Sequence, residues 1–123
     1  MQVLIVYDVE NWAFHHLAKG LAACAPAGVS VTLCNVEQAN QFSAERLLEY
    51  GAIYYMSWTS APIGFLSSCR RVVTLVTSSG PLYETYDPAD WNTRIVTGSR
   101  NAGKARMRLK HFDAVITVNE RLR

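Results

Sequence analysis

Polar and aromatic side chains follow several apolar segments of this sequence, at the points where those segments end. After the apolar residues 3–7 come Asp8, Glu10, Asn11 and Trp12. Similar residues follow later apolar segments, and these are Trp58, Thr77, Ser78, Asn119 and Glu120. Tryptophan rings stack on sugar rings, whereas carboxylates, amides and hydroxyls form hydrogen bonds with sugar hydroxyls. We therefore predict that these residues bind a sugar, with ordinary loop and helix-cap roles as the alternative; no catalytic residue is assigned among them.

The histidines and cysteines form no pattern of metal ligands. His15 and His16 are adjacent, so on a helix they point about 100° apart and cannot both face one ligand. The three cysteines are widely spaced, without a Cys-x-x-Cys pair: Cys24, Cys34 and Cys69. We predict no metal and no cofactor, and three buried or half-buried thiols in a reducing compartment. For His15 the prediction is a solvated helix face, with a catalytic role as the alternative.

The elements that must position these residues alternate along the chain. Apolar, β-branched segments predict strands near residues 3–7, 29–33, 52–57, 72–77 and 114–118. Helices are predicted over 12–25, after a cap at Ser43, and over 99–111. Asn11 is placed to cap the first helix, in which several apolar residues recur at helical spacing: Phe14, Leu17, Ala18, Leu21 and Ala22.

This alternation predicts an α/β fold over residues 1–123, as one domain. We expect a Rossmann-like open parallel sheet with helices on both faces and with the first strand central. Ligands of such sheets bind at the carboxyl ends of the strands, so the polar residues named above should gather at that edge.

Composition narrows the class of protein further. Half of the 123 residues are hydrophobic and 18% are charged, which is typical of a globular domain. The formal net charge of +2 gives no reason to expect nucleic acid as a partner. The first apolar segment stops at Asp8, too early for a signal peptide or a membrane helix, so we expect a cytoplasmic protein.

One stretch is strongly basic, with no acidic residue between Asp90 and Asp113. Its charged residues are Arg94, Arg100, Lys104, Arg106, Arg108 and Lys110. On a helix they predict a solvated face, with Ala102, Ala105, Leu109 and Phe112 on the inner side. Contact with an anionic lipid, a phosphorylated ligand or nucleic acid is the functional alternative, and for a lipid it would be a weak membrane contact.

Two segments resemble a known family. Residues 3–14, VLIVYDVENWAF, are similar to the opening of some GT-B glycosyltransferases, where the first strand ends in Asp and Trp-Ala-Phe begins the first helix. Residues 109–122, LKHFDAVITVNERL, resemble a strand near the end of the acceptor-side domain of these enzymes.

The resemblance implies the acceptor-side domain of an enzyme that moves a sugar from a nucleotide-sugar donor to an acceptor. A C-terminal domain, absent from this chain, would bind most of the donor, so the chain is expected to be inactive alone. Val9, Glu10 and Asn11 stand where many relatives have a glycine-rich turn, and no residue matches the catalytic base of the family.

Other α/β classes fit less well. A receiver domain needs Asp at the end of the third strand and Lys at the end of the last, where this chain has Met56-Ser57-Trp58 and Asn119. No Gly-x-Gly-x-x-Gly follows any strand, which argues against a dinucleotide enzyme. A non-catalytic Rossmann-like binding or interaction module is the remaining alternative to the transferase.

Overall fold

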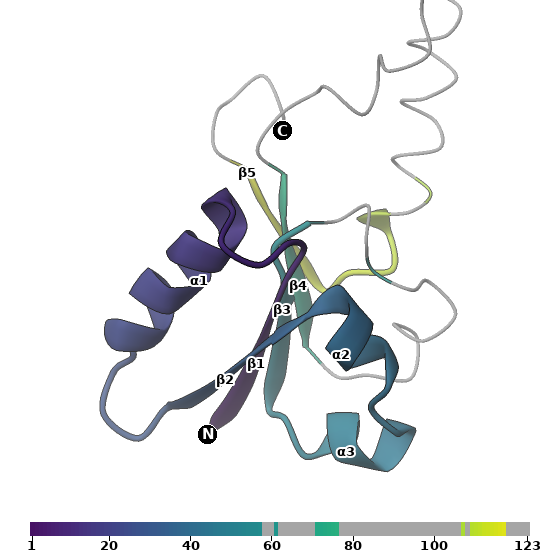
Figure 1. The fold of residues 1–123 in the computed structure, drawn as a ribbon. Helices are drawn as coiled ribbons and strands as arrows, with labels where there is room; N and C mark the ends of the chain where they lie inside the picture. The colour runs from purple at the N-terminus through teal and green to yellow at the C-terminus, as the bar shows by residue number, and fades with distance from the viewer. Residues whose placement is uncertain (58–60, 62–70, 77–106, 108, 118–123) are drawn as a thin grey trace, which may run out of the picture.

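The fold is an open sheet of five parallel strands, seen in a computed structural model that describes residues 1–57, 61, 71–76, 107 and 109–117. The strands are β1 (Gln2–Tyr7), β2 (Ser30–Asn35), β3 (Ala52–Tyr55), β4 (Val72–Val76) and β5 (Ala114–Thr117), in the order β2-β1-β3-β4-β5 (Figure 1). Each predicted strand is present, and the α/β parallel-sheet prediction is confirmed. The predicted central place of β1 is wrong, because three strands lie on one side of it and only β2 on the other.

The strand register aligns the carboxyl ends of all strands along one edge of the sheet. Val6 of β1 lies beside Cys34 of β2 and Tyr55 of β3, and Val76 of β4 lies beside Thr117 of β5. The chain runs outward from β1 to β2 and then returns past β1 to form β3. The strand order therefore reverses between β1 and β3, and parallel sheets commonly bind ligands at the carboxyl ends of the strands at such a point.

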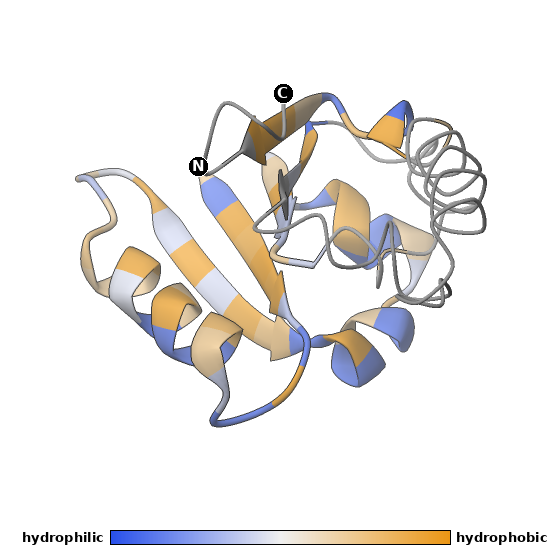
Figure 2. Cartoon of the chain, turned by 90° about the horizontal axis from the view of Figure 1, so that it is seen from above, coloured by the Kyte–Doolittle hydropathy of each residue, from blue (hydrophilic) through white to orange (hydrophobic). Residues whose placement is uncertain are grey.

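Helix α1 (Ala13–Ala23) covers one face of the sheet, beside β1 and β2 (Figure 1). Ile5 and Tyr7 point to this face and belong to one buried cluster with Ala18 of the helix. Phe14 is half-buried and packs against the same cluster. Seen from above, β1 is hydrophobic along most of its length (Figure 2), as a strand covered on both faces must be.

The inner side of α1 differs from the predicted one. His15 and Ala18 are buried, whereas Leu17 and Leu21 are exposed. The prediction of a solvated His15 is therefore wrong. Ala18 is completely buried, so a small side chain sits where the helix contacts the sheet, and this rotates His15 inward and the two leucines outward.

Helices α2 (Val36–Asn40) and α3 (Ala44–Leu48) cover the opposite face, so both faces carry helices as predicted. The buried cluster on this face includes Leu4, Val6, Leu47, Ile53, Val72 and Phe112. Ser43 caps α3 as predicted, because its Oγ accepts a hydrogen bond from the Arg46 N–H at 3.2 Å. Helix α2 was not predicted, although Asn35 and Gln38 form a capping box at its start.

The segment before β5 is held to the sheet by its apolar and acidic side chains. Leu109 packs against the core beside the buried Phe112, as predicted. The Asp113 carboxylate accepts a hydrogen bond from the Val72 N–H at 2.6 Å, and the Asp113 N–H donates to the Val72 carbonyl at 2.7 Å.

The rest of the predicted basic helix is only partly described. Ala102 and Ala105 lie outside the described residues, as do five of its basic residues: Arg94, Arg100, Lys104, Arg106 and Arg108. No helix in the described part of the chain is long and apolar enough to cross a membrane.

Candidate functional site

The loop between β1 and α1 brings four of the predicted ligand residues together. Asp8 directly follows β1 and is half-buried, while Glu10, Asn11 and Trp12 are exposed. The loop lies at the carboxyl edge of the sheet, next to the point where the strand order reverses (Figure 1). We call residues 8–12 the ligand loop. Its position agrees with the edge predicted for a binding site.

The remaining predicted ligand residues lie outside the described part of the chain. They are Trp58, Thr77, Ser78, Asn119 and Glu120. The strands before Thr77 and Asn119 are described, and both run parallel to β1. These strands therefore end at the edge that carries the ligand loop. That the five residues themselves lie at this edge stays a prediction.

Two local hydrogen bonds, one to a side chain and one within the backbone, fold the ligand loop into a turn. The Asp8 Oδ1 accepts a hydrogen bond from the Val9 N–H at 2.7 Å, and the Trp12 N–H donates to the Val9 carbonyl at 3.4 Å. Asn11 has φ = 62°, in the left-handed region that residues with a Cβ avoid. This turn points the chain from the end of β1 into the first turn of α1.

The predicted helix cap at Asn11 is wrong. Trp12 occupies the N-cap position of α1, and its side chain makes no capping hydrogen bond. Trp12 is 67% exposed, so an aromatic side chain faces solvent in the same loop as Asp8 and Glu10. Asn11 is instead the left-handed residue of the turn, a role that asparagine tolerates better than most residues.

Sequence reasoning missed the residue that holds this turn. His15 is only 5% exposed, and its Nδ1 accepts a hydrogen bond from the Asn11 N–H at 2.8 Å. The imidazole also stacks on the ring of Tyr7, with ring centroids 4.3 Å apart and planes 15° apart. His15 lies three residues before Ala18, which the sequence already placed among the inner residues of the helix, and this spacing was the available signal for an inward histidine.

Tyr7 and Cys34, near the carboxyl ends of β1 and β2, have raised pKa values and stay neutral at physiological pH. Burial raises the pKa of Tyr7, and the nearby Glu10 carboxylate and Cys34 raise it further. Burial also raises the pKa of the Cys34 thiol to about 11, partly opposed by the positive charge of Arg46. A thiol with so high a pKa is a poor nucleophile, so these two groups favour packing over covalent chemistry.

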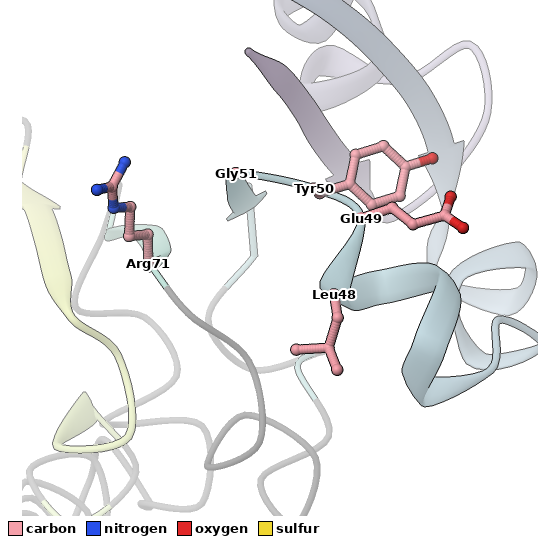
Figure 3. A pocket seen from close by; sticks show the side chains of 5 residues that line it. All are labelled: Leu48, Glu49, Tyr50, Gly51 and Arg71. Atoms are coloured by element: carbon pink, nitrogen blue, oxygen red, sulfur yellow. The ribbon is translucent and has the colours of Figure 1, made fainter.

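A cavity of about 280 Å³ lies at the opposite edge of the sheet and was not predicted. It is lined by Leu48, Glu49, Tyr50, Gly51 and Arg71, and Figure 3 shows the charged groups of Glu49 and Arg71 at different sides of it. Gly51 precedes β3 and Arg71 precedes β4, so this is the amino edge. We favour the carboxyl edge as the ligand site because the strand order reverses there and because the indole of Trp12 is open to solvent there.

Among the described residues, no group of three His, Cys, Asp or Glu side chains is placed to hold a metal ion. Comparison of the whole sequence with protein-family models and with curated proteins finds no match.

Proposed function

We propose that this chain is the acceptor-side domain of a GT-B glycosyltransferase and that its ligand loop receives the sugar acceptor. The observation that carries the proposal is the exposed side chain of Trp12, which belongs to the same loop as Asp8 and Glu10 at the carboxyl edge of the sheet. In the GT-B arrangement a second α/β domain binds the nucleotide-sugar across the cleft. The chain by itself is then expected to bind an acceptor without transferring sugar to it.

The fold supports this proposal at the segments that carry the resemblance. Residues 3–14 run from β1 through the ligand loop into the first residues of α1, the strand-loop-helix unit expected from the family. Residues 114–117, within the second similar segment, form strand β5. A strand, loop and helix start in the first segment, and a strand in the described part of the second, support the proposal.

The chemistry of the loop suits a sugar. The apolar C–H face of a sugar ring can stack on an indole, and covering about 60 Å² of Trp12 would contribute about 1.5 kcal/mol. The carboxylates of Asp8 and Glu10 are acceptors for sugar hydroxyl groups, and hydrogen bonds to a charged group contribute about 1.5–3 kcal/mol each. Together these contacts give the loop both an apolar and a polar means of holding one ring.

Calorimetric titration of the chain with hexoses, N-acetylhexosamines and short oligosaccharides tests the proposal. The variant Trp12→Ala should weaken the affinity for the bound sugar about tenfold, because it removes the stacking surface. Leu48→Ala is the matched control, since Leu48 is similarly exposed, at 59%, but lines the cavity at the amino edge. A sugar that binds both variants equally well would contradict the proposal, as would the absence of binding by any sugar tested.

A further inference from the structure

His15 is a buried polar side chain whose Nδ1 accepts a hydrogen bond from a backbone N–H of the ligand loop. A backbone N–H can only donate, so the contact from Asn11 requires an unprotonated Nδ1 on His15. In the neutral imidazole the proton is then on Nε2. The hydrogen bond therefore fixes the tautomer as well as the position of the ring.

The position of His15 in α1 explains how it acts on the loop. With Trp12 as N-cap, His15 is the third residue of the helix. In a capping box, the side chain at this position reaches back to the backbone N–H of the N-cap. Here the imidazole reaches one residue further back, to Asn11, and so provides an acceptor for an amide of the left-handed turn.

Stacking against Tyr7 completes the arrangement. Tyr7 is the last residue of β1 and is itself buried against α1. Because its ring lies 4.3 Å from that of His15 and nearly parallel to it, the imidazole is held on one side by the strand. One side chain thus joins the end of β1, the ligand loop and the first turn of α1.

We propose that His15 is a positioning residue for ligand binding: its Nδ1 holds Asn11 in the left-handed conformation and so presents Asp8, Glu10 and Trp12 to the acceptor. The role in binding rests on the proposed function, whereas the ordering of the loop does not. His15 acts through Asn11 and is not assigned a contact with the sugar.

Two substitutions of His15 distinguish the effect of its hydrogen-bond acceptor from the effect of ring stacking. His15→Asn keeps an acceptor atom at the same number of bonds from the backbone but loses most of the stacking surface. His15→Phe keeps a ring for Tyr7 but has no acceptor. His16→Phe is the matched control, because His16 is the exposed neighbour on the same helix.

Amide hydrogen exchange, measured by NMR on the ligand-free chain, provides the first readout. His15→Phe should accelerate exchange of the Asn11 N–H about tenfold, whereas His15→Asn and His16→Phe should leave it close to that of the unsubstituted chain. Unchanged exchange in His15→Phe would overturn the proposal. A long-range proton–nitrogen spectrum of the unsubstituted chain gives a test that needs no variant, and a proton on Nδ1 of His15 would also overturn it.

Sugar affinity provides the second readout. His15→Phe should weaken acceptor binding about tenfold, and His15→Asn should restore most of it. Faster exchange with unchanged affinity would show that His15 orders the loop without positioning a ligand, which overturns the proposal. If the unsubstituted chain binds no sugar, the proposed function fails, and the role of His15 in ligand positioning fails with it; the exchange result then still decides whether His15 orders the loop.

Discussion

Replacing Asn11 with alanine and with glycine tests the conformation of the ligand loop directly. At φ = 62° a side chain with a Cβ is disfavoured by about 1–2 kcal/mol, and glycine carries no such penalty. Glycine also gives the unfolded chain extra freedom, which lowers stability by about 0.5–1 kcal/mol. The difference between the two effects predicts that Asn11→Gly is more stable than Asn11→Ala by about 0.5–1 kcal/mol.

Gly20→Ala is the control, because here replacing glycine with alanine should stabilise the protein. Gly20 lies within α1, has no positive φ, and a Cβ added there would meet no atom within 4 Å. Gly20→Ala should therefore raise the free energy of unfolding by about 0.5–1 kcal/mol. Urea unfolding followed by circular dichroism measures all three variants. If Asn11→Ala is at least as stable as Asn11→Gly, the left-handed turn, and with it the role given to His15, is wrong.

Three further predictions concern the core and the sheet. Cys34 should react with iodoacetamide at pH 8 far more slowly than the exposed Cys24, as peptide mapping by mass spectrometry can show. Burial raises the pKa of the Cys34 thiol from 9.0 to about 11 in the folded state, so the unfolded chain loses this proton at lower pH. The free energy of unfolding should therefore fall between pH 9 and 11 by up to about 2 kcal/mol more than it falls in Cys34→Ala. Equal pH dependence in the two proteins would contradict this. Thr74→Val should lower the free energy of unfolding by about 1 kcal/mol, because the buried Thr74 hydroxyl donates a hydrogen bond at 2.9 Å to the Tyr55 carbonyl of β3. An unchanged urea midpoint would count against this hydrogen bond. Asp113→Ala should lower it by about 1–3 kcal/mol because the Val72 N–H loses its acceptor, whereas Asp113→Asn, which keeps an acceptor oxygen, should lower it less; equal losses would argue against the hydrogen bond.

The strands and the ligand loop were predictable because their signals are local. Five apolar, β-branched segments correspond to the five strands, and the polar residues that follow the first of them form the turn at its end. The helix cap at Ser43 was predictable for the same reason, because one helical turn brings the serine oxygen to the backbone N–H three residues later.

What could not be predicted depends on contacts between distant elements. The inward face of α1 is set by how closely Ala18 approaches the sheet, and the stripe of leucines in the sequence pointed to a different face. The hydrogen bond between the Asn11 N–H and His15 spans only four residues, but it forms only when α1 turns His15 inward. The position of β1 beside β2 and β3 depends on the side of the sheet to which the chain returns, which the strand segments do not encode.

The central claim is that a sugar acceptor binds the ligand loop, and chemical-shift mapping tests it most directly. The nitrogen-15-labelled chain would be titrated with the sugar that binds most tightly in calorimetry. We predict saturable shifts of the backbone amides of residues 8–12 and of the Trp12 indole, with little change at residues 48–51 or at Arg71. Shifts confined to residues 48–51 and Arg71 would place the ligand in the cavity at the amino edge and contradict the account.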